Sequence, residues 1–165
     1  MGNSILILDR QRIQLKLERM AYEIWETNSR ESELVLIGIE QSGYAVAAQL
    51  ARRLEAICSI RISLEKLKIN KRSPLKDPIH LDAALDGKSI ILVDDVADSG
   101  RTLLFALKPL LEFEPKKVQI AVLVDRKHKS FPVAPDIIGY SLATTLQDHI
   151  EVTCEGEDIL GAYLS

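Results

Sequence analysis

Hydrophobic residues recur along this chain with two different spacings. Apolar residues three or four positions apart predict amphipathic helices, whereas continuous or alternating apolar runs of about four to eight residues predict strands. The expected helices comprise residues 10–28, 44–54 and 102–113. The expected strands comprise residues 34–39, 57–64, 88–94, 118–124, 137–142 and 150–154.

The ends of these elements carry their own signals. Asp9 is suited to cap the first helix, and Asn28–Arg30 ends it. Pro109 lacks a backbone N–H and must bend or shorten the third helix. Residues 65–78 are polar and basic and contain two prolines, so they predict a long loop. The apolar stripe of the first helix consists of Ile13, Leu17, Met20 and Ile24.

The order of these elements indicates the architecture. Strands that alternate with helices are typical of an α/β domain built on a parallel sheet. The chain shows no repeat, low-complexity tract or interdomain linker, and its length suits one domain spanning residues 1–165. Ligands of open parallel sheets bind at the carboxyl ends of the strands. We therefore expect the loops after Ile39, Asp94 and Val124 to converge on one crevice.

Residues 89–102 hold the most informative pattern in the chain. A buried strand leads directly into Asp94 and Asp95, which we expect at an exposed strand end, where carboxylates can accept hydrogen bonds from sugar hydroxyls. The following turn offers backbone N–H groups, two hydroxyls and a glycine at the start of a helix, an arrangement suited to phosphate. Its residues are Asp98, Ser99, Gly100, Arg101 and Thr102. The pattern predicts a sugar-phosphate site.

Two other interpretations account for part of this pattern. Asp and Ser often cap helices and occupy solvated turns, so an acid pair alone predicts no ligand. The apolar run 90–93 before the acids and the Ser-Gly-Arg-Thr sequence after them favour the ligand site. A phospho-accepting receiver domain also has paired acids, but there they follow the first strand. Here they lie past the midpoint of the chain.

Two further segments contain candidate anion contacts. The loop after residue 39 contains Gln41, Ser42 and Gly43 and opens a helix, although it matches neither the Walker loop nor the dinucleotide fingerprint. The loop 65–78 either binds an anion or remains solvated. Its cationic residues are Lys66, Lys68, Lys71, Arg72 and Lys76.

Composition narrows the class of protein. The chain has 165 residues, of which 47% are hydrophobic and 27% charged, as in an ordinary globular protein. Its net charge of −3 argues against general affinity for nucleic acid. Cys58 and Cys154 are too few for a disulfide framework, which suggests reduced thiols in a cytoplasmic protein. We also expect no signal peptide and no membrane span.

The segment 89–102 resembles the signature of the type I phosphoribosyltransferases, which bind 5-phosphoribosyl 1-diphosphate (PRPP). The resemblance implies a central parallel sheet flanked by helices, with a long flexible loop and a small hood. It implies that Asp94 and Asp95 hold the ribose, that residues 98–102 hold its 5′-phosphate, and that Gln41–Gly43 form the diphosphate loop. It further implies that Mg²⁺ binds mainly through PRPP, with no metal ligated directly by the protein. A base or the diphosphate would contact Arg126 and Lys127.

Within this superfamily the chain looks most like the pyrimidine operon attenuator/uracil phosphoribosyltransferase family, over nearly its full length. The segments that carry this resemblance are 35–39, 90–96 and 119–139. It implies transfer of ribose 5-phosphate to a nucleobase, with uracil favoured, and a homo-oligomer.

Departures from the family's pattern keep other functions open. Asp98 is typical of the purine enzymes, where it lies near the reacting nitrogen of the base. The diphosphate loop has Gln41 and Ser42 where a basic residue is common, which suits a regulator that binds PRPP without chemistry. RNA binding is disfavoured because expected basic positions are occupied by other residues. These residues are Tyr22, Ala134 and Tyr140.

Overall fold

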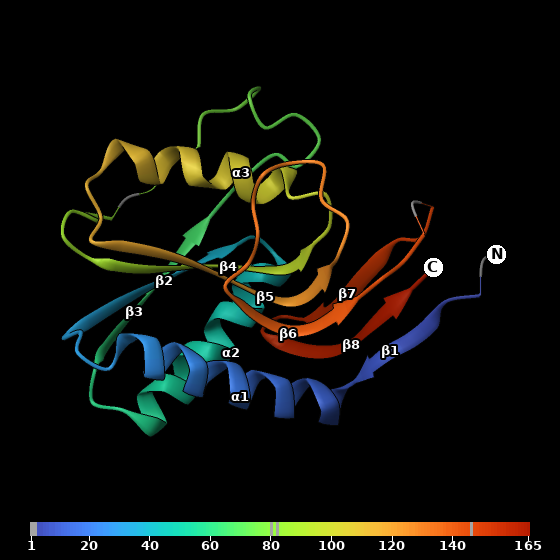
Figure 1. Cartoon of the computed structure of the whole chain (residues 1–165), viewed down its shortest axis with the longest axis horizontal. Coiled ribbons are helices and arrows are strands. Elements are labelled where there is room, and N and C mark those ends of the chain that lie inside the picture. The colour runs from blue at the N-terminus through green and yellow to red at the C-terminus, as the bar shows by residue number, and fades with distance from the viewer. Residues whose placement is uncertain (1–2, 80, 82, 146) are drawn as a thin grey trace.

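The computed structural model describes residues 3–79, 81, 83–145 and 147–165. Its centre is a sheet of five parallel strands (Figure 1). In spatial order the strands are β3 (Arg61–Leu67), β2 (Glu33–Ile39), β4 (Ser89–Ala97), β5 (Lys117–Arg126) and β6 (Ile137–Leu142). This arrangement confirms the predicted α/β fold with a central parallel sheet.

Helices cover both faces of this sheet. The helices α1 (Arg10–Asn28) and α2 (Ser42–Ile57) lie on one face, and α3 (Arg101–Leu107) lies on the other (Figure 1). Successive strand residues point to opposite faces. In β4, Ile91 and Val93 accordingly pack with α1 and α2, whereas Ile90 and Leu92 pack with α3.

The first helix has the predicted cap and the predicted buried stripe. The Asp9 carboxylate accepts a hydrogen bond from the Arg12 backbone N–H at 2.8 Å. The apolar stripe of α1 is fully buried, as predicted, and comprises Ile13, Leu17, Met20 and Ile24.

We expect Asp9→Ala to lower the free energy of unfolding by about 1 kcal/mol, because the first turn of α1 loses its cap. Urea unfolding followed by circular dichroism measures this change. Asp9→Asn is the matched control, since its side-chain oxygen can still accept the Arg12 N–H. An equal loss of stability in both variants would contradict the capping role of Asp9.

Several predicted boundaries were wrong. The helix predicted at 44–54 extends to Ile57, so the following strand begins at Arg61 rather than at residue 57. That strand continues to Leu67, because parallel pairing with β2 holds residues 65–67 in the sheet instead of in a loop. The third helix is shortened, as Pro109 predicted, and a 3-10 turn follows it at Lys108–Glu112.

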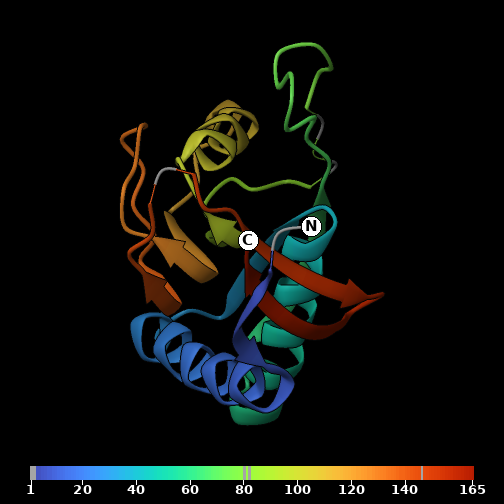
Figure 2. The ribbon, with the colours of Figure 1, turned by 90° about the vertical axis from the view of Figure 1, so that its right-hand side faces the viewer.

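A second, smaller sheet forms the hood that the resemblance implied (Figure 2). It is antiparallel, and its strands in spatial order are β1 (Ile5–Asp9), β8 (Asp158–Leu164) and β7 (Ile150–Glu155). The sequence pattern predicted β7 but missed β1 and β8. Residues 68–79 project away from the central sheet, and the flexibility expected of this loop stays a prediction. Within the described part of the chain, no helix combines the length and apolar character needed to cross a membrane.

Candidate active site

A cleft of about 460 Å³ lies between the carboxyl end of β4, the start of α3 and the first residues of β7. The loop after β2 reaches it through Ser42, and the loop between β3 and β4 reaches it through Lys71. The predicted convergence of loops on one crevice therefore holds for the segments after Ile39 and Asp94. Arg126, which follows Val124, is absent from the cleft wall and contacts it through Asp98.

The acid pair lies on the cleft wall, but its two members differ in environment. Asp94 is 1% exposed, and its Oδ1 accepts the Asp95 backbone N–H at 2.9 Å. Burial, followed by the charge of Asp95, raises the pKa of Asp94 well above its ordinary value of 3.8, and Lys71 opposes that rise. The expectation that both acids lie at an exposed strand end was wrong for Asp94. The reason is that β4 continues beyond it to Ala97 and α2 begins against it.

Lys71 is the residue of the predicted basic loop that lines this cleft. Its Nζ lies 3.7 Å from Asp94 Oδ1 and 4.0 Å from Asp95 Oδ1, so it partly neutralises the acid pair. Lys68 lines a different hollow beside Glu40 and Gln41, and Arg72 lines neither.

Residues 98–102 form the turn that the sequence predicted as a phosphate site, and all five line the cleft. Gly100 has a φ of +87°, which a side chain would disfavour, and it precedes the first residue of α3. The Ser99 carbonyl accepts the backbone N–H groups of Ser130 and Phe131 at 3.0 and 3.1 Å. The segment after β5 is therefore hydrogen-bonded to the backbone of this turn.

The predicted diphosphate loop connects β2 to α2. Ser42 lines the cleft, whereas Gln41 lines an adjoining groove with Tyr44 and residues of the hood. Gly43 packs against β4 so closely that a Cβ atom would lie 2.7 Å from Asp94 Oδ1. This contact places the start of α2 directly beside the acid pair.

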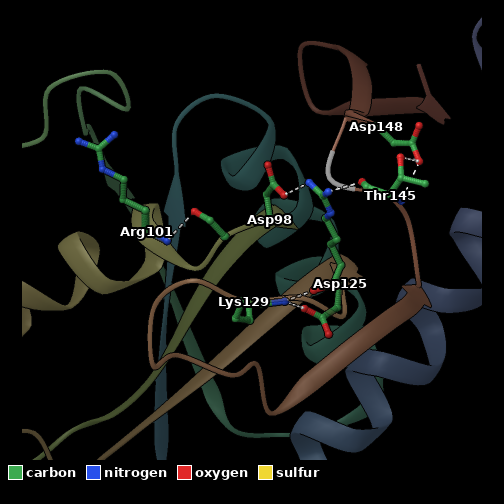
Figure 3. Close-up of polar contacts among 8 residues, drawn as sticks. Asp98, Arg101, Asp125, Lys129, Thr145 and Asp148 are labelled. Carbon is green, nitrogen blue, oxygen red and sulfur yellow. Dashed lines mark hydrogen bonds and ion pairs between the residues drawn. The ribbon is translucent and has the colours of Figure 1, made fainter.

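Arg126 and Lys127, predicted to contact a base or the diphosphate, have different environments. Arg126 is buried, and its Nη1 donates to Asp98 Oδ1 at 2.7 Å (Figure 3). Lys127 is exposed and is not part of the cleft wall, and its backbone N–H donates to the Leu142 carbonyl at 3.2 Å. The structure thus joins Arg126 to the turn and leaves Lys127 outside it.

The hood contributes to the cleft, which the sequence pattern did not predict. His149, which precedes β7, and the first residues of that strand line the cleft together with the turn; the strand residues are Ile150, Glu151 and Val152. The pattern had predicted a strand at 150–154, but no local signal shows which distant segment a strand faces.

Carboxylates on the cleft wall are the protein groups suited to a Mg²⁺ ion. No cluster of three or more His, Cys, Asp and Glu side chains capable of holding a metal occurs among the described residues. The wall of the cleft carries the carboxylates of Asp98 and Glu151 as well, but the two that are adjacent in the chain are those of Asp94 and Asp95. This pair fits an ion that takes most of its oxygen ligands from water and a phosphorylated substrate, as Mg²⁺ commonly does.

The fold and the cleft define a phosphoribosyltransferase-like site. The family model of the phosphoribosyl transferase domain matches residues 6–154, which contain the acid pair and the turn at 98–102. The chain therefore belongs to the phosphoribosyltransferase family.

Two relatives show its place within this family. The bifunctional protein PyrR of Halalkalibacterium halodurans is 37% identical over 159 residues, covering 89% of this chain and 88% of the relative. That of Alkaliphilus metalliredigens is 33% identical over 163 residues, covering 93% and 90%. The chain is thus a member of the family of bifunctional PyrR proteins, which confirms the resemblance to the attenuator/uracil phosphoribosyltransferase family.

Solved structures share the fold at lower identity. The hypoxanthine-guanine phosphoribosyltransferase of Bacillus anthracis matches with a TM-score of 0.77 and 20% identity, covering 94% of this chain and 96% of that chain. The hypoxanthine phosphoribosyltransferase of Trypanosoma cruzi matches with a TM-score of 0.77 and 17% identity, covering 94% of each. These matches confirm the phosphoribosyltransferase-like fold.

Proposed function

We propose that this protein transfers ribose 5-phosphate from PRPP to a nucleobase and releases diphosphate. The observation that carries the proposal is one cleft that joins an acid pair to a turn rich in backbone N–H groups and hydroxyls. The acids, Asp94 and Asp95, suit the ribose hydroxyls, and the turn at 98–102 suits the 5′-phosphate. The family match spans both features.

The chemistry follows from the positions of these groups. The bond between ribose C1′ and the diphosphate oxygen breaks, a bond from C1′ to a base nitrogen forms, and the base loses a proton. Positive charge develops on the ribose ring, and the carboxylates of Asp94 and Asp95 stabilise it by their negative charge. The turn anchors the 5′-phosphate and keeps C1′ in position for the base. When bound, Mg²⁺ would neutralise charge on the diphosphate, and Asp94 and Asp95 are the residues that would hold the ribose hydroxyls beside it.

Uracil is the favoured base because of the resemblance to the uracil phosphoribosyltransferases. A purine base is the alternative, because Asp98 stands on the cleft wall and can accept the proton of a purine nitrogen. The solved structures with this fold carry the names of hypoxanthine-type enzymes, which makes purines worth testing.

Diphosphate release with a panel of bases tests the proposal. The protein is incubated with PRPP, Mg²⁺ and either uracil, hypoxanthine, guanine, xanthine or adenine, and diphosphate is measured by a coupled enzyme assay. We expect turnover with uracil and a nucleoside 5′-monophosphate as the product. Absence of turnover with all five bases would contradict the transferase proposal for these substrates.

A regulator that binds PRPP or a nucleotide is the second candidate function. The diphosphate loop favours it, because Gln41 and Ser42 add no positive charge and Glu40 adds a negative one. Calorimetric binding of PRPP without turnover would support this candidate.

RNA binding is the less supported candidate. Tyr22 is 46% exposed on α1, and Lys16 Nζ lies 5.8 Å from the centre of the Tyr140 ring, so tyrosines occupy places where basic side chains would suit phosphate. Gel shifts over a salt series decide the matter, since phosphate contacts weaken as salt rises. We expect no shift even at low salt.

A further inference from the structure

A buried arginine ties the turn at 98–102 to the connection between β6 and β7. Arg126 Nη1 donates to Asp98 Oδ1 at 2.7 Å, and Nη2 donates to the Thr145 backbone carbonyl (Figure 3). The side chain of Arg126 is 9% exposed, whereas that of Asp98 is 53% exposed. The arginine therefore lies behind the cleft wall, and Asp98 stands on it.

Thr145, the second partner of Arg126, makes further hydrogen bonds. The backbone N–H and the hydroxyl of Thr145 both donate to Asp148 Oδ2 at 2.8 Å. These hydrogen bonds lower the pKa of Asp148, and the charge of Arg126 adds to the effect. The next residue, His149, lines the cleft. One guanidinium group thus contacts both Asp98 and Thr145.

Stability alone does not account for this arrangement. The Nε of Arg126 is buried and has no hydrogen-bond partner among the residues described by the structure. A buried charged group with an unpaired donor costs free energy, and its partner carboxylate on Asp98 is half-exposed, so water weakens the attraction between the two charges. The pair is better explained by what Asp98 presents to the cleft.

We propose that Arg126 is a positioning residue for the nucleobase, an inference that rests on the proposed transfer reaction. By occupying Asp98 Oδ1, it turns Oδ2 toward a ligand as a hydrogen-bond acceptor. By holding Thr145, it also ties Asp98 to the hydrogen-bonded pair of Thr145 and Asp148. The ligand that this geometry suits is a planar heterocycle with an N–H group directed at Asp98.

A double-mutant cycle tests the inference. Initial rates are measured for Arg126→Gln, Asp98→Asn and the double variant, with the base and PRPP varied separately. Each single change is expected to raise the KM for the base by about 10- to 100-fold, the value of a charge-assisted hydrogen bond. The KM for PRPP should change by less than about twofold, and the double variant should resemble the single ones, because both changes remove the same contact.

The control is Arg53→Gln, which removes a half-buried guanidinium that bonds Gln49 and Gln14 in a region outside the cleft. Its KM values for base and PRPP should both stay near those of the parent protein. Effects of Arg126→Gln and Asp98→Asn that multiply in the double variant would overturn the inference. Equal losses of affinity for base and PRPP would overturn it as well.

Binding measurements separate this inference from the proposed reaction. Calorimetry compares ribose 5-phosphate with uridine and inosine 5′-monophosphates on the parent protein and on Arg126→Gln. We expect at least one nucleotide to bind the parent protein more tightly than ribose 5-phosphate does, and Arg126→Gln to lose that advantage. No advantage in the parent protein would overturn the inference. Tight nucleotide binding without turnover would instead contradict the transferase proposal and leave Arg126 in its positioning role.

Discussion

Asp94→Asn is expected to abolish most of the transfer activity while making the fold more stable. Asp94 is 1% exposed, and its carboxylate lies next to that of Asp95. Asn has nearly the same shape, and its side-chain oxygen can still accept the Asp95 N–H. Removal of this buried charge should raise the free energy of unfolding at neutral pH by about 1 kcal/mol or more. Loss of a charge beneath the ribose ring should lower kcat by about 10²- to 10³-fold.

The pH dependence of stability provides a second measure of the same effect. Burial raises the pKa of Asp94 in the folded protein above its ordinary value of 3.8, so the folded state binds the proton more tightly than the unfolded state. The contribution of Asp94 to stability is therefore complete below about pH 4 and is lost as pH rises through the folded pKa. Asp94→Asn removes this loss, so the difference in stability between variant and parent should grow with pH.

Urea unfolding between about pH 4 and pH 8, together with diphosphate release, measures both effects. Asp95→Asn is the matched control, because the side chain of Asp95 is 15% exposed and its removal relieves less burial of charge. Asp95→Asn should lose about as much activity as Asp94→Asn but gain less stability. Unchanged activity in Asp94→Asn would refute its role at the ribose. If Asp94→Asn were less stable than the parent protein at neutral pH, the buried charge of Asp94 could not be destabilising the fold.

Asp94 also shows where sequence reasoning reached its limit. The apolar run before the acid pair correctly predicted the strand β4, and the turn at 98–102 follows it on the same cleft wall. The burial of Asp94 depends on Gly43, which lies more than fifty residues earlier in the chain and packs on β4. The spacing of apolar residues predicts whether a segment is a helix or a strand. Whether the end of that segment is buried depends on tertiary contacts.

The hood illustrates the same limit for the fold. The strands β2, β4 and β5 were predictable because each contains a nearly continuous apolar run buried on both faces. In contrast, β1 and β8 pair with each other from opposite ends of the chain, with Ile5 opposite Leu164. Gly161 further interrupts the apolar pattern of β8. Such long-range pairing leaves no periodic signal within either segment.

The pairing of Arg126 with Asp98 was hidden for a related reason. Arg126 and Asp98 were both predicted to belong to the site, but Arg126 was expected to contact a ligand itself. The parallel register of β4 and β5 places Ala97 beside Asp125, so the residues that follow in each strand are neighbours. With that register known, an acidic residue next to a basic one at the carboxyl edge predicts an ion pair.

Gly43→Ala is expected to disrupt both the fold and the site. A Cβ atom on Gly43 would lie 2.7 Å from Asp94 Oδ1, 2.9 Å from Asp94 Cα and 3.0 Å from the Val93 carbonyl oxygen. Two of these three atoms belong to the backbone of β4, at the centre of the sheet, so they cannot move aside as a flexible side chain would. Overpacking of this kind should lower the free energy of unfolding by about 1–3 kcal/mol. It should also push the start of α2 away from the acid pair.

Urea unfolding and calorimetric titration with ribose 5-phosphate measure these two consequences of Gly43→Ala. Ser42→Ala is the control for stability, because it alters the neighbouring residue without adding an atom and should change the free energy of unfolding by less than about 0.5 kcal/mol. We expect Gly43→Ala to bind ribose 5-phosphate more weakly even under conditions where it is fully folded, since displacement of α2 moves a wall of the cleft. Parent-like stability and affinity in this variant would show that α2 and β4 do not meet as closely as the structure places them, and the burial of Asp94 that depends on this contact would have to be abandoned.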